Sequence, residues 1–206
     1  MKKISFGLDV GLVGSSNSFN ESFFEYLKKL SIPSSSSSET PSKNKVFNVF
    51  IVFNGVPIKI RVHLAKNFED IIYMSDKINK IDVLILVLDV YDLTSKDQYK
   101  PKDIKEIIEV FSFKGTSVLL GIDTKKIEKE DDFDGFRISR YDLVQKTKEL
   151  DLLYCFEIQN KNKDIKDFFE IILSDHVFKF AITNPELLEQ SKIYGTHLME
   201  MRQGER

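Results

Sequence analysis

The segment from Asp9 to Ser16 is the best candidate in this sequence for a phosphate-binding loop. Such a loop needs glycines that allow close backbone approach, a lysine on the β- and γ-phosphates, and a Ser or Thr that ligates magnesium. Gly14 and Ser16 occupy suitable positions. Ser15, however, stands where the lysine belongs, and Asp9 stands where the first glycine belongs. The segment therefore lacks the cation on which phosphate binding depends.

No other register supplies the missing charge, because no lysine or arginine lies between Lys3 and Lys28. We also expect the Asp9 carboxylate to lie close to the position of the phosphates and to repel them. A hydrogen bond to a charged group contributes about 1.5–3 kcal/mol. Loss of the lysine alone should therefore weaken phosphate binding by about tenfold to a hundredfold.

The magnesium and base positions of a guanine-nucleotide site also hold unsuitable residues. The magnesium motif Asp-x-x-Gly, expected after a hairpin strand, is replaced by His63 to Lys66. A neutral imidazole is a poor magnesium ligand, and lysine lacks the backbone freedom of glycine. The base-reading motif Asn-Lys-x-Asp is replaced by Ile122, Asp123, Thr124 and Lys125, so that its final acceptor has become a donor.

Because the phosphate, magnesium and base positions all differ, we expect no nucleotide, no metal ion and no other cofactor. The three histidines lie far apart in the sequence, without acidic or thiol partners at ligand spacing. We assign no catalytic residue and expect that the chain is not an enzyme. The alternative is an atypical small GTPase in which Lys66 folds over the loop and replaces the missing lysine.

The composition favours one globular domain inside a cell. A chain of 206 residues, 42% of them hydrophobic, is long enough for one domain of ordinary size with appended sequence. The net charge of −2 provides no field to hold nucleic acid or an anionic membrane, so we expect neither as a partner. The apolar runs are too short to span a bilayer. The one cysteine, Cys155, cannot form an intrachain disulfide, which favours a reducing compartment.

The apolar pattern predicts strands that alternate with helices. Strands are expected at residues 4–13, 46–53, 58–64, 83–90, 118–122 and 152–158, and helices near residues 19–30, 104–111, 141–150 and 165–172. The turn Asn54-Gly55 joins the second and third strands as a hairpin. This order predicts an α/β fold with a mostly parallel six-stranded sheet, one antiparallel edge hairpin and helices on both faces. It is the order of a Ras-like, P-loop GTPase-type domain.

We expect the domain to cover residues 1–180. Within it, residues 31–45 are rich in serine and should form a mobile loop, since they cannot bury enough apolar surface. Residues 181–206 are expected to form a C-terminal extension, with a short helix at 186–194 and a frayed end from Met201.

Aromatic residues near the ends of elements are candidates for contacts with protein partners. Two segments, around residues 111–115 and 178–184, could form one face. The candidate partner-binding residues are Phe111, Phe113, Lys114, Phe178, Phe180, Ile182 and Thr183.

The pentapeptide from Val62 to Lys66 resembles the end of the hairpin strand in the centromere protein M (CENP-M) family of Ras-like pseudo-GTPases. Shorter similarities extend from about Leu12 to Asn184. They comprise Leu12-Val13-Gly14, Ile81-Asp82, Leu153-Tyr154-Cys155, His176-Val177 and Asn184. The sequence departs from the family in its serine-rich loop, its longer hairpin and Asp175, where a glycine commonly precedes the histidine.

The resemblance implies a non-catalytic scaffold subunit of the inner kinetochore, located in the nucleus at the centromere. It implies a helical-repeat partner, CENP-I, assembly with CENP-H and CENP-K, and a role in chromosome segregation. A nucleotide-free Ras-like adaptor in a trafficking or motor complex remains an alternative.

Overall fold

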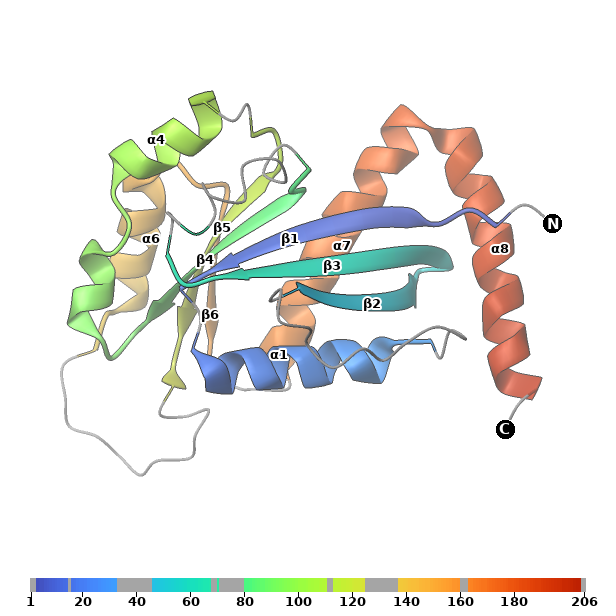
Figure 1. Cartoon of the computed structure of the whole chain (residues 1–206), viewed down its shortest axis with the longest axis horizontal. Coiled ribbons are helices and arrows are strands. Elements are labelled where there is room, and N and C mark those ends of the chain that lie inside the picture. The colour runs from blue at the N-terminus through green and yellow to red at the C-terminus, as the bar shows by residue number, and fades with distance from the viewer. Residues whose placement is uncertain are drawn as a thin grey trace.

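The computed structural model of the chain describes residues 3–14, 16–32, 46–67, 70, 80–110, 113–124, 137–159 and 163–204. Within these ranges, six strands form one sheet in the order β2-β3-β1-β4-β5-β6 (Figure 1). The strands are β1 (Phe6–Val13), β2 (Val46–Phe53), β3 (Val56–Ala65), β4 (Val83–Asp89), β5 (Thr116–Ile122) and β6 (Tyr154–Ile158). Neighbouring strands are parallel except for the pair β2 and β3. The predicted α/β class and the mostly parallel sheet with one antiparallel edge pair are therefore confirmed.

The hairpin turn forms where the sequence predicts it. Asn54 and Gly55 have φ values of 50° and 79°, the positive values that a tight two-residue hairpin turn requires. The expected loop starts later than residue 31, because Ser31 bridges to Ile51 of β2 and the Ile32 amide donates to the Phe50 carbonyl at 2.9 Å. The rest of that expected loop, residues 33–45, lies outside the described residues.

Helices cover both faces of the sheet because the central strands are apolar on both sides. Alternate residues of β4 belong to two separate hydrophobic clusters, one on each face. One cluster includes buried residues of α1 (Asn17–Leu30) and α7 (Lys163–Thr183). The other includes buried residues of α4 (Pro101–Val110) and α6 (Arg140–Glu149), and the short helix η1 (Leu93–Asp97) precedes α4. The unbroken apolar run of β4 is thus explained by burial on both faces.

The C-terminal region differs from the prediction. The helix α7 continues to Thr183, so the expected domain boundary after residue 180 falls inside it. The next helix, α8, runs from Pro185 to Gly204, which makes both the expected short helix and the expected frayed end from Met201 wrong within the described residues. α8 lies across the end of the hairpin (Figure 1), where Leu188 and Ser191 are buried and the Ser191 hydroxyl donates to the Ile4 carbonyl at 3.3 Å.

A glycine at the middle of α8 explains why the predicted helix was too short. Glycine normally weakens a helix interior, which favours a helix end near Tyr194. Gly195 instead lies against the hairpin turn, where an added Cβ would overlap the carbonyl oxygen of Gly55 and touch Pro57. The absence of a side chain lets the helix backbone approach the hairpin, and this packing outweighs the low helix propensity.

We expect Gly195→Ala to lower the free energy of unfolding by about 2 kcal/mol, because the new methyl group would force two backbones apart. In an open helix the same change would instead stabilise the fold by up to about 1 kcal/mol. Urea unfolding measures the difference, and Thr196→Ala at the adjacent exposed position is the control, with a change of about 0.5 kcal/mol or less. A Gly195→Ala protein as stable as the unmodified chain would contradict this account of the packing.

Candidate functional site at the carboxyl edge of the sheet

The degenerate nucleotide motifs lie along the carboxyl edge of the parallel strands, or run up to it. In open α/β sheets this edge is where ligands bind, beyond the ends of the strands. Here β1 ends at Val13, β4 at Asp89 and β5 at Ile122. The edge is therefore the first place to look for a site.

The connection between β1 and α1 is too short to surround a phosphate group. β1 continues to Val13, and the Ser16 hydroxyl already caps α1 by accepting from the Phe19 amide at 3.3 Å. Only residues 14–16 join the two elements, and Ser15 lies outside the described residues. Five of the eight candidate loop residues, 9–13, are strand. A phosphate-binding loop needs a run of free backbone amides. In a strand, the backbone amides instead donate hydrogen bonds to the neighbouring strands.

A buried tyrosine fills the space beside this connection. The Tyr99 hydroxyl lies 2.9 Å from the carbonyl oxygens of both Val13 and Val87 and can donate to either. Gly14 has a φ of 76°, and a Cβ at this position would overlap the Tyr99 hydroxyl. Burial raises the pKa of Tyr99 well above its ordinary value, so the hydroxyl stays protonated and continues to donate.

Asp9 does not lie near the connection, so the expectation that it repels phosphates there is wrong. It lies within β1, paired in register with Arg61 of β3, and its side chain is 8% exposed. The carboxylate forms an ion pair with Arg61, and its second oxygen lies 3.1 Å from Nε2 of His63. The Asp9 amide donates to the Asp82 carboxylate at 2.8 Å. The Asp9 carboxylate therefore links β1 to β3 through Arg61 and His63.

His63 and Lys66 are likewise not arranged as a magnesium site. His63 is still part of β3, two residues before the strand ends at Ala65, and it faces Asp9. Lys66 follows the strand directly, and its amide donates to the Asp70 carboxylate at 2.8 Å. In the described part of the chain, no group of three His, Cys, Asp or Glu residues is placed to hold a metal ion.

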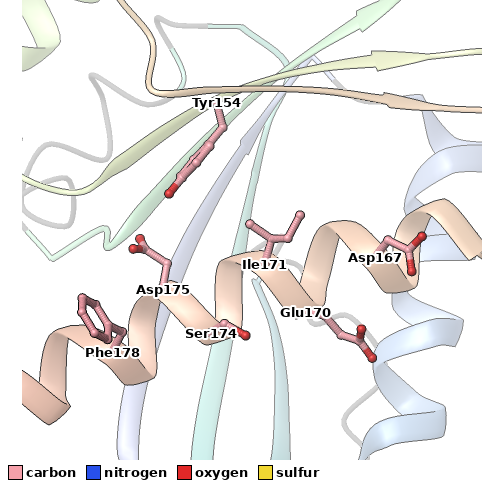
Figure 2. Close-up of a pocket in the computed structure, with 7 residues that line it drawn as sticks. All are labelled: Tyr154, Asp167, Glu170, Ile171, Ser174, Asp175 and Phe178. Atoms are coloured by element: carbon pink, nitrogen blue, oxygen red, sulfur yellow. The ribbon is translucent and has the colours of Figure 1, made fainter.

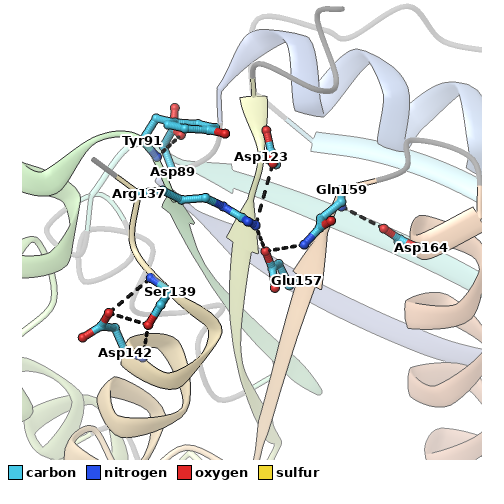
Figure 3. Close-up of polar contacts among 9 residues, drawn as sticks. All are labelled: Asp89, Tyr91, Asp123, Arg137, Ser139, Asp142, Glu157, Gln159 and Asp164. Carbon is cyan, nitrogen blue, oxygen red and sulfur yellow. Dashed lines mark hydrogen bonds and ion pairs between the residues drawn. The ribbon is translucent and has the colours of Figure 1, made fainter. Parts of the chain in front are cut away.

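The base position is occupied by an internal ion-pair network (Figure 3). Asp123 follows the buried Ile122 and is itself fully buried. The Arg137 guanidinium lies 3.8 Å from the Asp123 carboxylate and forms an ion pair with Glu157 of β6. Glu157 also accepts from the Gln159 side-chain amide at 2.7 Å. Arg137 thus links the end of β5 to β6 beside the residues of the degenerate base motif.

Asp89 at the end of β4 is also satisfied by the protein. Its carboxylate accepts from the Tyr91 amide at 3.0 Å and from the Thr124 hydroxyl at 2.9 Å. Lys125, the last residue of the degenerate base motif, lies outside the described residues. The sequence pattern does not indicate a role for Tyr99 or Arg137. Both make their contacts with residues that are distant in the sequence: Tyr99 with Val13, and Arg137 with Glu157.

The predicted partner-binding residues divide into exposed and buried ones. Phe178 and Ile182 are 62% and 66% exposed, and Lys114 and Thr183 are exposed as well. Phe113, in contrast, is buried in the core cluster that faces α4 and α6, so its expected exposure is wrong. Phe111 lies outside the described residues.

Phe180 is half-buried because aromatic neighbours hold it. Its ring centroid lies 4.0 Å from that of Phe6 and 5.0 Å from the His176 ring. His176 is buried and hydrogen-bonds the Gly7 backbone, and burial lowers its pKa. Burial has the opposite effect on the nearby Asp82 carboxyl group, whose pKa it raises, because in both groups burial disfavours the charged form. Phe180 therefore packs against the sheet and is not a freely exposed side chain.

Polar contacts link α7 to the start of β5 at the amino edge of the sheet, directly after the first of the two segments that were expected to share a face. Lys179 of α7 donates to the hydroxyl of Thr116, the first residue of β5, at 2.8 Å. The same hydroxyl donates to the Asp175 carboxylate at 3.0 Å, and Asp175 pairs with Lys179 at 3.3 Å. Residues 113–115 therefore lie beside the C-terminal turns of α7, at the end of the sheet opposite the nucleotide positions.

The chain matches no model of a known protein family, and no curated protein matches it. No helix among the residues that the structure describes is long and apolar enough to cross a membrane.

We expect Arg137→Met to lower the free energy of unfolding by about 2–3 kcal/mol, because it leaves the buried carboxylates of Asp123 and Glu157 without their cation. The expected loss is below that for a fully buried pair, since the Arg137 side chain is 32% exposed. Urea unfolding measures it. Arg140→Met, at the exposed first residue of α6, is the matched control and should change stability by less than about 0.5 kcal/mol. Equal effects of the two variants would disprove the structural role of Arg137.

Proposed function

We propose that this chain is a non-catalytic pseudo-GTPase with a Ras-like fold that acts as a scaffold subunit of the inner kinetochore. The observation that carries the non-catalytic part is the three-residue connection between β1 and α1, with Tyr99 packed against it. A triphosphate there would need a loop of free backbone amides, which the extended strand leaves no room for, and space beside Gly14, where the Tyr99 hydroxyl lies.

The order of the elements supports the Ras-like form of the α/β fold. The chain enters the sheet at β1, passes through α1 to the edge hairpin β2 and β3, and then adds β4, β5 and β6 in turn on the other side of β1. Helices from both sides complete the three layers. This is the arrangement expected for a Ras-like domain with an antiparallel edge hairpin.

The kinetochore assignment rests on the resemblance to the CENP-M family. The pentapeptide Val62 to Lys66 spans the end of β3, where an active enzyme would carry its magnesium motif. By this assignment the chain resides in the nucleus at the centromere, binds a helical-repeat protein of the CENP-I kind, and supports assembly with CENP-H and CENP-K. The exposed residues Lys114, Phe178, Ile182 and Thr183 at the amino edge are the proposed contacts.

Titration with fluorescent guanine nucleotides tests the pseudo-GTPase proposal. We expect no saturable binding of labelled GDP or GTP up to about 1 mM, with magnesium or with a chelator, because neither the phosphate loop nor its lysine is present. An active small GTPase measured in parallel is the positive control. Saturable micromolar binding that requires magnesium would instead support the atypical GTPase.

A matched pair of variants tests the partner face. Ile182→Glu should lower the amount of helical-repeat protein that co-purifies with the tagged chain by about tenfold or more, because it places a charge in an apolar contact. Ile193→Glu is the control, since Ile193 on α8 is 62% exposed and Ile182 is 66% exposed. Circular dichroism should show both variants folded. Undiminished recovery with Ile182→Glu, or equal losses with both variants, would be inconsistent with the proposed face.

A further inference from the structure

The outer side of α7 carries a stripe of side chains that the domain does not use for its own packing. Its inner side is buried in the core through Ile165, Phe168, Phe169, Ile172, Leu173 and His176. On the outer side, residues recur at intervals of four, three, four and four positions, which places them in one row along the helix. They are Asp167, Ile171, Ser174, Phe178 and Ile182. Ile171 and Phe178 are 43% and 62% exposed, although both are large and apolar.

The first four residues of this row form part of one wall of a groove of about 660 Å³ (Figure 2). The other wall is Tyr154 at the start of β6, whose ring projects toward α7 between Asp175 and Ile171. Among the described strands, β6 lies at the edge of the sheet and pairs with β5 alone. The groove runs along α7 beside this edge. From Asp167 to Phe178 it is about 16 Å long, at 1.5 Å per helical residue.

The groove is acidic. Three of the side chains that line it are carboxylates, Asp167, Glu170 and Asp175, and none of its described lining residues is Lys or Arg. Asp175 is paired with Lys179, and Glu170 lies 3.6 Å from Lys166 in an exposed pair that contributes little. The pKa of Tyr26 is raised mainly by burial, and the negative charges of Glu170 and Asp167 raise it further.

We propose that this groove is a docking site for an amphipathic helix of a partner protein, one whose apolar residues are flanked by lysines or arginines. A row of apolar positions at helical spacing matches the apolar face of a second helix packed along it. The acidic lining complements basic flanks, which would favour the correct partner and speed its association. The inference rests on the proposed scaffold function and deepens it: it extends the proposed contacts at Phe178 and Ile182 along α7 and names the chemistry of the partner.

Other occupants fit the groove less well. A second copy of the chain would bring the same carboxylates against one another, which costs free energy. A small molecule would leave the outward side of Phe178 in water, whereas a helix covers it. Nucleic acid and anionic lipid carry the same sign of charge as the groove and would be repelled.

Site-specific cross-linking in the full chain tests the occupant. The photo-reactive residue p-benzoylphenylalanine is placed at Ile171 and, as a control, at Tyr141 on α6, which is 71% exposed. The tagged proteins are irradiated in their own cells, and mass spectrometry identifies the linked peptides. We expect Ile171 to link to a segment of another protein with net positive charge and apolar residues at helical spacing, well above the Tyr141 background. Background-level linking at Ile171, or linking to a second copy, an acidic segment, a lipid or a nucleic acid, would overturn the proposal.

Charge reversal then measures the electrostatic part. The double variant Asp167→Lys with Glu170→Lys should reduce the cross-linked partner by about tenfold, because it replaces attraction by repulsion. Reversal of the basic residues in the linked segment should restore it. Lys105→Glu with Lys102→Glu on α4 is the control for a general change of charge and should have no effect. A groove variant that links its partner undiminished would also overturn the proposal.

The outcomes separate this inference from the proposed function. Loss of the helical-repeat protein with Ile182→Glu, together with undiminished linking in the groove variant, would leave the scaffold function in place and remove the groove. Magnesium-dependent nucleotide binding, together with loss of the cross-linked partner in the groove variant, would contradict the pseudo-GTPase proposal and leave the groove in place.

Discussion

The hydroxyl of Tyr99 contacts the last carbonyl of β1 and a carbonyl of β4, and the geometry of the connection between β1 and α1 depends on this contact. It can form only because β1 stays extended to Val13, so that its carbonyl points at a fixed donor. The same extension leaves three residues for the turn into α1. Gly14 then needs a positive φ and no side chain, because the tyrosine occupies the space that a Cβ would take. The contact of Tyr99 and the conformation of the connection between β1 and α1 are therefore linked.

The two edges of the sheet have opposite characters. At the carboxyl edge, the carboxylates contact groups of the protein itself: Arg137 pairs with Glu157 and lies 3.8 Å from the buried Asp123, and Asp89 accepts from Tyr91 and Thr124. A buried charge needs such partners, and a site whose charges are already paired has little left to offer a ligand. At the amino edge and along α7, by contrast, large apolar side chains stay exposed beside carboxylates. The exposed apolar side chains therefore lie away from the carboxyl edge, where open α/β sheets usually bind ligands.

The helix α7 connects these properties, because it serves the core and the surface with different faces. Its inner face supplies phenylalanines to the cluster that also holds α1, and His176 anchors it to the start of β1. The large apolar side chains on its outer face, such as Phe178, are exposed and do not pack in the core. The Thr116, Asp175 and Lys179 contacts fix the last turns against β5. A partner bound along the outer face would thus meet a helix that is already rigid, with little ordering cost.

The sequence by itself determined the class of the fold and most of the strands. The alternation in β3, the Asn54-Gly55 turn and the unbroken apolar run of β4 each follow from local periodicity or turn chemistry, which is why they could be predicted. It also determined that the motif residues for phosphate, magnesium and base are missing. Only the tertiary structure decided that Asp9 pairs with Arg61 and His63 in the sheet, that Phe113 is buried and that α8 continues past Gly195. It also decided that Tyr99 contacts the end of β1 and that Arg137 pairs with Glu157. Each of these depends on contacts between residues far apart in the chain, and no local pattern encodes which distant side chain will occupy a given space.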